Sequence, residues 1–166
     1  MRTVERSITV QAAPDYLFDV LTHSPNERHW MLGVTGSEHC TAGPLRQGSK
    51  MICKFGIGPF TTMKADAVID EFEPGRRFVR RRVGGVMIMR GDFMVEPSDS
   101  GGARFIWKMN VGLCSWRIFS AMLDPFLAWW MKTSMNISMM KLKTLAESRK
   151  LAGTATGETE RVPRYT

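Results

Sequence analysis

The sequence predicts an α+β fold in which a seven-stranded antiparallel sheet curves around one long C-terminal helix. Between residues 34 and 113, six short segments alternate apolar and polar side chains and are separated by turns that contain glycine or proline. This pattern is typical of antiparallel strands joined by short connections. After residue 125, apolar residues recur with the period of an α-helix.

The N-terminal region predicts one strand followed by two short helices. Residues 4–10 alternate as a half-buried strand does. Pro14 suits the first turn of a helix, and Asp15 suits the positive end of the helix dipole. The sequence Ser24-Pro25-Asn26 ends this helix and opens a second, shorter one that includes Trp30.

The six remaining strands are predicted from their alternation and from the turn residues between them. Their expected bounds are residues 34–40, 48–55, 60–73, 76–83, 86–96 and 103–113. Alternate positions assign the faces, so Phe105, Trp107 and Met109 share the apolar side of the last strand, and Arg104 and Lys108 share the other. A sheet covered on one side only has this character.

The last third predicts a transition, CSWRIFSAMLDP, followed by a helix that runs to about Lys150. On a helical wheel one stripe is expected to face the sheet; it comprises Leu123, Leu127, Trp130, Ser134, Ile137 and Leu145. We therefore expect a single domain over residues 1–150. The small, polar residues 151–166 are expected to form a disordered tail.

Composition narrows the class of protein. The 166 residues carry a formal net charge of +7, yet no recognition helix or exposed aromatic residues accompany the basic clusters, so nucleic-acid binding is not expected. No apolar run approaches the roughly 18 residues of a membrane span. Three widely spaced cysteines, with no signal-peptide pattern at the N-terminus, favour a cytoplasmic protein without a disulfide framework.

Four segments together resemble the START-like helix-grip (SRPBCC) superfamily, and within it the polyketide cyclase/dehydrase and lipid-transport group. They are VERSITVQAAPDYLFDVLTHSPNERHW, IDEFEPGRRF, FMVEPSDSGGARFIW and MKLKTLAE, which span about residues 3–148 in this order. The resemblance implies a cavity between the sheet and the C-terminal helix that binds lipids, polyketides or other hydrophobic molecules. It also implies strand, two helices, six strands and a long helix, the order that periodicity indicates independently.

Candidate ligand-binding residues are those expected to face this cavity. Thirteen methionines give the chain flexible, polarizable side chains that suit an adaptable apolar pocket, although methionine also fills ordinary cores. Inward alanines leave volume unless a bulky neighbour fills it. The apolar candidates are Trp30, Met51, Cys53, Phe55, Met63, Ala65, Ala67, Met89, Phe93, Phe105, Trp107, Met109, Trp130 and Ile137, with the polar Ser134 on the helix.

Arg80 and Arg82 are the charged candidates, and the sequence leaves their direction open. They occupy the same alternate positions of the strand as Phe78, and this assignment would turn them toward the cavity. There a ligand carboxylate would suit their forked hydrogen-bond donors. The neighbouring Val79 and Val83 are also apolar, and the opposite assignment would turn both arginines to solvent. The ligand is therefore expected to be small and hydrophobic, and an acid group on it is one alternative.

No catalytic, metal-binding or cofactor-binding motif is present in the sequence. The histidines His23, His29 and His39 lack a neighbouring nucleophile motif. We expect a binding or transport protein for a hydrophobic ligand. The alternatives are a polyketide cyclase, aromatase or dehydratase that acts by holding its substrate, and a co-chaperone-like interaction module.

Two further expectations concern surfaces. Trp129, with Trp116 and Phe119, forms either an exposed apolar patch or a lid over the cavity. An exposed patch beside lysines would allow peripheral contact with an anionic membrane. The sequence gives no indication of the oligomeric state.

Overall fold

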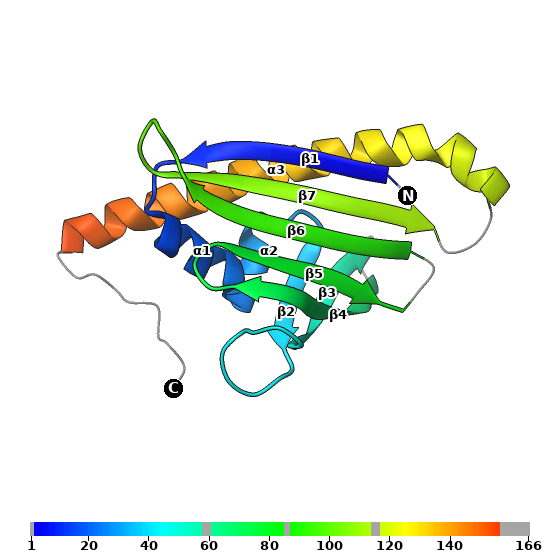
Figure 1. Ribbon diagram of the computed structural model, residues 1–166, viewed down its shortest axis with the longest axis horizontal. Coiled ribbons are helices and arrows are strands. Elements are labelled where there is room, and N and C mark those ends of the chain that lie inside the picture. The colour runs from blue at the N-terminus through cyan, green and yellow to red at the C-terminus, as the bar shows by residue number, and fades with distance from the viewer. Residues whose placement is uncertain (1, 58–60, 85–86, 114–116, 157–166) are drawn as a thin grey trace.

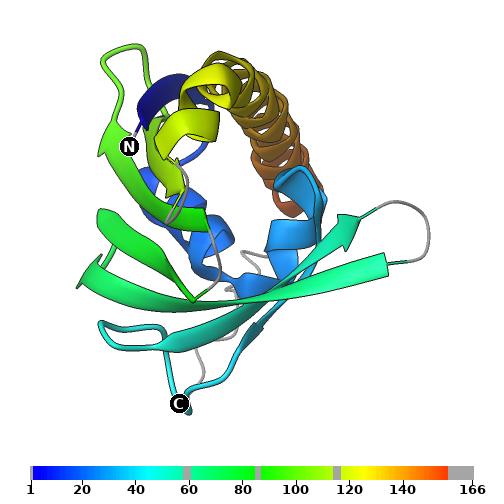
Figure 2. The same cartoon turned by 90° about the vertical axis from the view of Figure 1, so that its right-hand side faces the viewer.

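The computed structural model describes residues 2–57, 61–84, 87–113 and 117–156. One antiparallel sheet curves around the molecule, and the long helix α3 (Arg117–Thr156) runs along its concave side. Figure 1 shows α3 passing behind β1 (Arg2–Val10) and β7 (Ala103–Leu113), and Figure 2 shows the sheet wrapping around the space that α3 and the short helices share. The predicted α+β architecture is confirmed.

The seven strands follow the order β1-β7-β6-β5-β4-β3-β2, with every neighbouring pair antiparallel. Each predicted strand is present; the last has the predicted bounds, and the ends of the others differ by at most two residues. The remaining strands are β2 (Val34–His39), β3 (Lys50–Ile57), β4 (Thr61–Glu73), β5 (Arg77–Val83) and β6 (Met87–Pro97).

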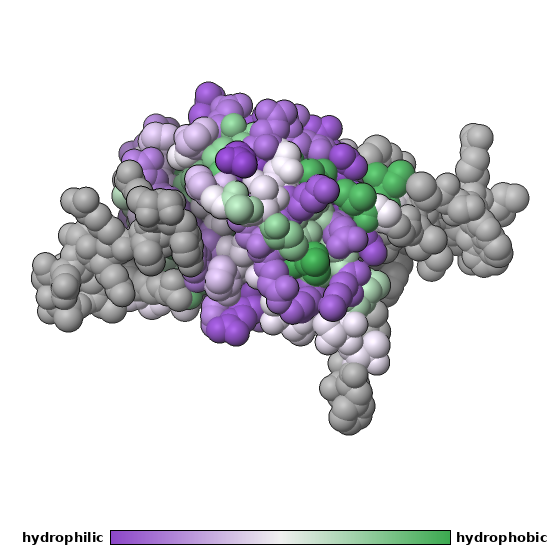
Figure 3. Space-filling view, turned by 90° about the horizontal axis from the view of Figure 1, so that it is seen from below, coloured by the Kyte–Doolittle hydropathy of each residue, from purple (hydrophilic) through white to green (hydrophobic). Residues whose placement is uncertain are grey.

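The two faces of the sheet differ as the alternation predicts. Ala65, Ala67 and Ile69 are buried on β4, whereas Lys64, which precedes them, and Asp66, between the two alanines, are exposed. A register shift between Ile69 and Glu71 then changes the alternation further along the strand. Figure 3, seen from the side of β3 and β4, shows a mostly hydrophilic surface with a smaller hydrophobic group toward the right.

Two short helices follow β1, as predicted, with a single 3-10 turn (Ser24–Asn26) between them. Helix α1 (Pro14–Thr22) begins with proline at its first position, where no backbone N–H is needed. Its buried face includes Phe18, whose ring contacts Phe72 and Phe78 on the sheet. Helix α2 (Glu27–Trp30) is a single turn, and it places Glu27 and Trp30 in the interior.

Helix α3 differs from the prediction at both ends and in the face that it buries. It begins at Arg117, so Pro125 lies inside it rather than at its start, and it continues six residues past Lys150. Proline removes one backbone hydrogen bond but does not end this helix. Residues 151–156 of the predicted disordered tail are therefore helical, and residues 157–166 lie outside the description.

The stripe predicted to face the sheet is rotated. Trp130 and Ile137 are exposed, whereas Met131, Met135 and Met139 are buried. Leu142 and Ala146 continue the buried face, and the predicted Leu123 and Leu127 lie outside the residues whose side chains are described. The wheel favoured large aromatic and branched residues, but the flexible methionines fill the space against the sheet.

Candidate functional site

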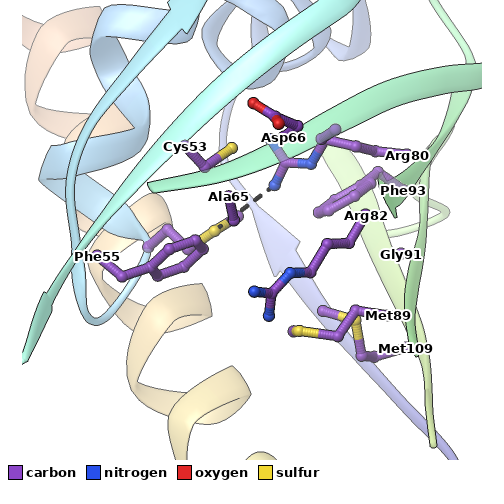
Figure 4. A pocket seen from close by; sticks show the side chains of 12 residues that line it. Cys53, Phe55, Ala65, Asp66, Arg80, Arg82, Met89, Gly91, Phe93 and Met109 are labelled. Carbon is purple, nitrogen blue, oxygen red and sulfur yellow. Dashed lines mark hydrogen bonds between the residues drawn. The ribbon is translucent and has the colours of Figure 1, made fainter. Parts of the chain in front are cut away.

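A pocket opens on the concave side of the sheet, with its walls on five consecutive strands (Figure 4). The space between its walls is about 490 Å³ when the solvent at its open mouth is included, and the centre of a water-sized molecule can occupy about 80 Å³ of it. The lining residues are Met31, Cys53, Phe55, Ala65, Asp66, Ala67, Arg80, Arg82, Met89, Gly91, Phe93 and Met109. The walls are thus apolar apart from the two arginines, the thiol and Asp66.

The pocket brings together many of the residues predicted from the sequence. Those that line it are Cys53, Phe55, Ala65, Ala67, Arg80, Arg82, Met89, Phe93 and Met109. Met31 and Gly91 also line it but carried no signal, since methionine after a helix and glycine in a strand are both common. Asp66 borders the pocket from an exposed position between the two alanines.

Other predicted residues lie elsewhere. Trp30 is buried in an aromatic core, with its ring centroid 6.4 Å from that of Phe105 and 5.8 Å from that of Trp107. Met51 is also buried in the core. Met63 pairs across the strands with Phe55 but is exposed.

The candidates on α3 do not line the described part of the pocket. Trp130 and Ile137 are 51% and 38% exposed, and Ser134 is half-buried. Trp129 is exposed as well, which favours the patch over the lid for this residue, whereas Trp116 and the side chain of Phe119 lie outside the described residues.

The direction of the arginines is settled by β5, whose inward face carries Phe78, Arg80 and Arg82. The side chain of Arg80 is only 11% exposed and pairs with Glu27 of α2, itself 3% exposed. The sequence analysis did not single out Glu27. The signal for it was indirect, because an arginine on the inward face of a strand requires a buried counter-charge.

Glu27 also explains how a guanidinium is retained in the interior. Burial by itself lowers the pKa of Arg80, but the attraction of Glu27 and its hydrogen bond act in the opposite direction, and the net shift is upward. Arg80 also lies over the ring of Phe93, 5.4 Å from its centroid, and a nitrogen of its guanidinium is 3.7 Å from the sulfur of Met31. Arg80 is therefore a fixed positive charge.

Cys53 adjoins this ion pair. Its sulfur lies 3.9 Å from Oε2 of Glu27 and 3.7 Å from the hydroxyl of Ser37. Burial raises the pKa of the Cys53 thiol, and Arg80 only partly opposes this effect. A thiol held protonated is a poor nucleophile, so the cluster does not resemble an activated cysteine site.

Arg82 has a different environment. Within the described part of the chain it has no ion pair or hydrogen bond, and its Nε is buried without a partner. Figure 4 shows its guanidinium extending into the pocket, on the side where Met89 and Met109 lie. The pocket therefore contains one neutralised arginine and one that is not.

Small residues keep the pocket open. Ala65 and Ala67 pair across the strands with Cys53 and Met51. A Cβ added at Gly91 would lie 2.8 Å from Cε2 of Phe93, closer than such atoms approach in proteins. Glycine at this position leaves room for the Phe93 ring, which lines the pocket.

The described residues were also compared with what a membrane-spanning helix and a metal site require. Of the helices described, none combines the length and the apolar character needed to cross a membrane. Among the described side chains, no group of three or more histidine, cysteine, aspartate or glutamate residues is placed to hold a metal ion.

Comparisons with known proteins agree with the fold. A family model for polyketide cyclase / dehydrase and lipid transport matches residues 1–147. None of the curated proteins matches the chain.

Similar folds occur among solved structures. A START superfamily protein from Mycobacterium smegmatis has a TM-score of 0.71 at 10% sequence identity, covering 88% of this chain and 97% of that one. TTHA0849 from Thermus thermophilus has a TM-score of 0.72 at 12% identity, covering 89% and 99%. The di-domain ARO/CYC BexL from the BE-7585A biosynthetic pathway has a TM-score of 0.63 at 18% identity, covering 91% of this chain and 47% of that one. At these identities the likeness shows the fold alone.

Proposed function

Because the chain belongs to the polyketide cyclase/dehydrase and lipid transport family, we propose that its pocket binds and carries a small hydrophobic ligand such as a lipid, a quinone or a polyketide-like molecule. The observation that carries this proposal is the pocket itself. Phe55, Met89, Phe93 and Met109 present apolar surface to this partly open space. Apolar surface that a ligand removes from water contributes about 25 cal/mol per Å².

The chemistry of the lining favours binding over catalysis. Arg80 keeps its proton because its pKa is raised, and the thiol of Cys53 is likewise held protonated. Neither group can accept a proton near neutral pH, as a general base must. An aromatase- or cyclase-type activity would require a base that these two residues do not supply. Asp66 is the one carboxylate among the lining residues, and it lies exposed at the border of the pocket. The open pocket also argues against the filled interior expected of a co-chaperone-like module.

Native mass spectrometry of protein purified without detergent tests the proposal. Wild-type protein is expected to carry a co-purified hydrophobic molecule. Ala65→Phe fills the pocket and should abolish this adduct, whereas Val68→Phe places the same side chain on the outer face of the same strand and should retain it. An adduct that survives Ala65→Phe unchanged would place the ligand outside the pocket.

Peripheral contact with an anionic membrane is a second proposal about the same activity, because a protein that carries a hydrophobic ligand has to contact the membrane from which it takes that ligand. Exposed Trp129 and Trp130 lie on α3 beside the exposed Lys132. Aromatic side chains with nearby cations favour the interface of anionic bilayers. Sedimentation with phosphatidylglycerol vesicles should decrease in the Trp129→Ala/Trp130→Ala double variant, and equal sedimentation of both proteins would contradict the proposal.

A further inference from the structure

We propose that the ligand of this pocket is an amphipathic acid and that Arg82, rather than Arg80, binds its carboxylate or phosphate group. This inference rests on the proposed function and specifies the chemical class of the ligand. It follows from the distribution of charge around β5, from the burial of Nε in the half-buried Arg82 and from the apolar walls that surround its guanidinium.

The arginines in and before β5 are paired with acids, with a single exception among the described residues. The pairs are Arg76 with Glu73 at 3.6 Å, Arg77 with Asp92 at 2.8 Å, Arg80 with Glu27, and Arg81 with Asp70 at 3.0 Å. Arg82 has no such partner. Of the two arginines that line the pocket, Arg82 thus carries the positive charge that is left uncompensated.

Arg80 is unsuited to bind a ligand acid because its guanidinium is already paired with Glu27. The carboxylate of Glu27 accepts a hydrogen bond from Nη1 of Arg80, and both side chains are almost fully buried. A second carboxylate brought to Arg80 would be placed close to that of Glu27, and like charges in a poorly solvated site repel strongly. Arg80 and Glu27 are therefore a neutral pair in the pocket wall.

Arg82 has the opposite character. A buried guanidinium nitrogen without a partner carries a desolvation cost that a ligand oxygen would relieve. The planar fork of arginine matches a carboxylate or phosphate with two parallel hydrogen bonds. Around it, Phe55, Met89 and Met109 offer surface only to an apolar body. One charged end and one apolar body define an amphipathic acid.

Calorimetric titration with dodecanoic acid and methyl dodecanoate at neutral pH separates charge from chain, because the two probes share the same alkyl body. Wild-type protein should bind the acid more tightly than the ester. Arg82→Met should weaken binding of the acid about tenfold to hundredfold, as expected for the loss of charge-assisted hydrogen bonds. It should change binding of the ester less than twofold. Arg82→Lys, which keeps the charge, should retain part of the preference.

Arg81→Met is the matched control, since Arg81 is adjacent on the same strand but lies exposed on the outer face. It should bind both probes as the wild type does. Dodecyl phosphate distinguishes the two acid groups: tighter binding than dodecanoate, again lost in Arg82→Met, assigns phosphate to Arg82, and weaker binding assigns carboxylate. Thermal unfolding of each variant establishes that it is folded, and Arg82→Gln provides a second neutral variant if Arg82→Met is not.

Equal losses for acid and ester, or no loss for either, in a folded Arg82 variant would overturn the inference while leaving the hydrophobic pocket intact. The proposed function fails differently. In that case wild-type protein would bind neither probe, and Ala65→Phe would be indistinguishable from it.

Discussion

Glu27 and Arg80 form a buried ion pair between a one-turn helix and the middle of a strand 53 positions later. The pair ties α2 to β5 and places a neutral, polar wall beside the pocket. Breaking such a pair leaves one charge buried without compensation, which costs more than the intact pair contributes.

Glu27→Gln should lower the free energy of unfolding by about 3 to 5 kcal/mol, because it leaves the Arg80 guanidinium uncompensated. Urea denaturation measures this loss. Glu38→Gln removes one partner of the exposed pair with Lys54 and should cost less than about 1 kcal/mol. A loss in Glu27→Gln no larger than that of the control would mean that Arg80 finds another partner or water.

The buried thiol of Cys53 should make stability decline at alkaline pH. Burial raises the pKa of Cys53 in the folded state, so its contribution is fully present below the ordinary pKa of a thiol and is lost as pH rises through the higher folded value. Urea unfolding across this range under reducing conditions should show a steeper decline for wild type than for Cys53→Ala. Parallel profiles would show that the thiolate is tolerated in the fold.

Gly91→Ala should destabilise the protein by about 1 to 3 kcal/mol, as overpacking commonly does, and weaken ligand binding. The new Cβ would lie 2.8 Å from the Phe93 ring and force it to move at the floor of the pocket. Gly36→Ala is the control in another strand, since its nearest neighbour would be Cδ of Lys54 at 3.8 Å. Thermal unfolding and titration of both variants measure the effects, and equal behaviour would show that Phe93 adapts freely.

The face of α3 that packs on the sheet can be checked by a pair of truncations. Met135 is buried, so Met135→Ala should cost about 2 to 5 kcal/mol. Ile137 is exposed, and Ile137→Ala should cost less than about 1 kcal/mol, as surface substitutions usually do. A larger loss for Ile137→Ala than for Met135→Ala in denaturant unfolding would instead support the helix face that the helical wheel predicts.

Much of the fold follows from local pattern. Strand alternation located all seven strands, and Pro14 and Ser24-Pro25-Asn26 located the two short helices, because these signals act over a few neighbouring residues. The same parity correctly placed Ala65, Ala67 and Met109 on the inner face. The resemblance to the START-like superfamily added the expectation of a cavity, and the family match confirms that resemblance.

Errors arose where several faces were equally apolar. The helix wheel of α3 could not distinguish a stripe with Trp130 from one with Met131 and Met135, since both are apolar and only packing against the sheet selects one. The transition that ends at Pro125 was expected to precede the helix, but the helix begins at Arg117 and is continuous across Pro125. Trp30, predicted to contact the ligand, is buried, and its ring contacts those of Phe105 and Trp107.

The sequence by itself determined the order of the elements and the inner face of strands such as β4 and β7, because backbone geometry couples neighbouring residues at fixed periods. It left the inner face of β5 open. Only the tertiary structure decided what the two inward arginines do. Arg80 and Arg82 are indistinguishable by parity, composition and neighbours along the chain. Folding brings Glu27 to Arg80 and no acid among the described residues to Arg82, so one is neutralised and the other is left for a ligand.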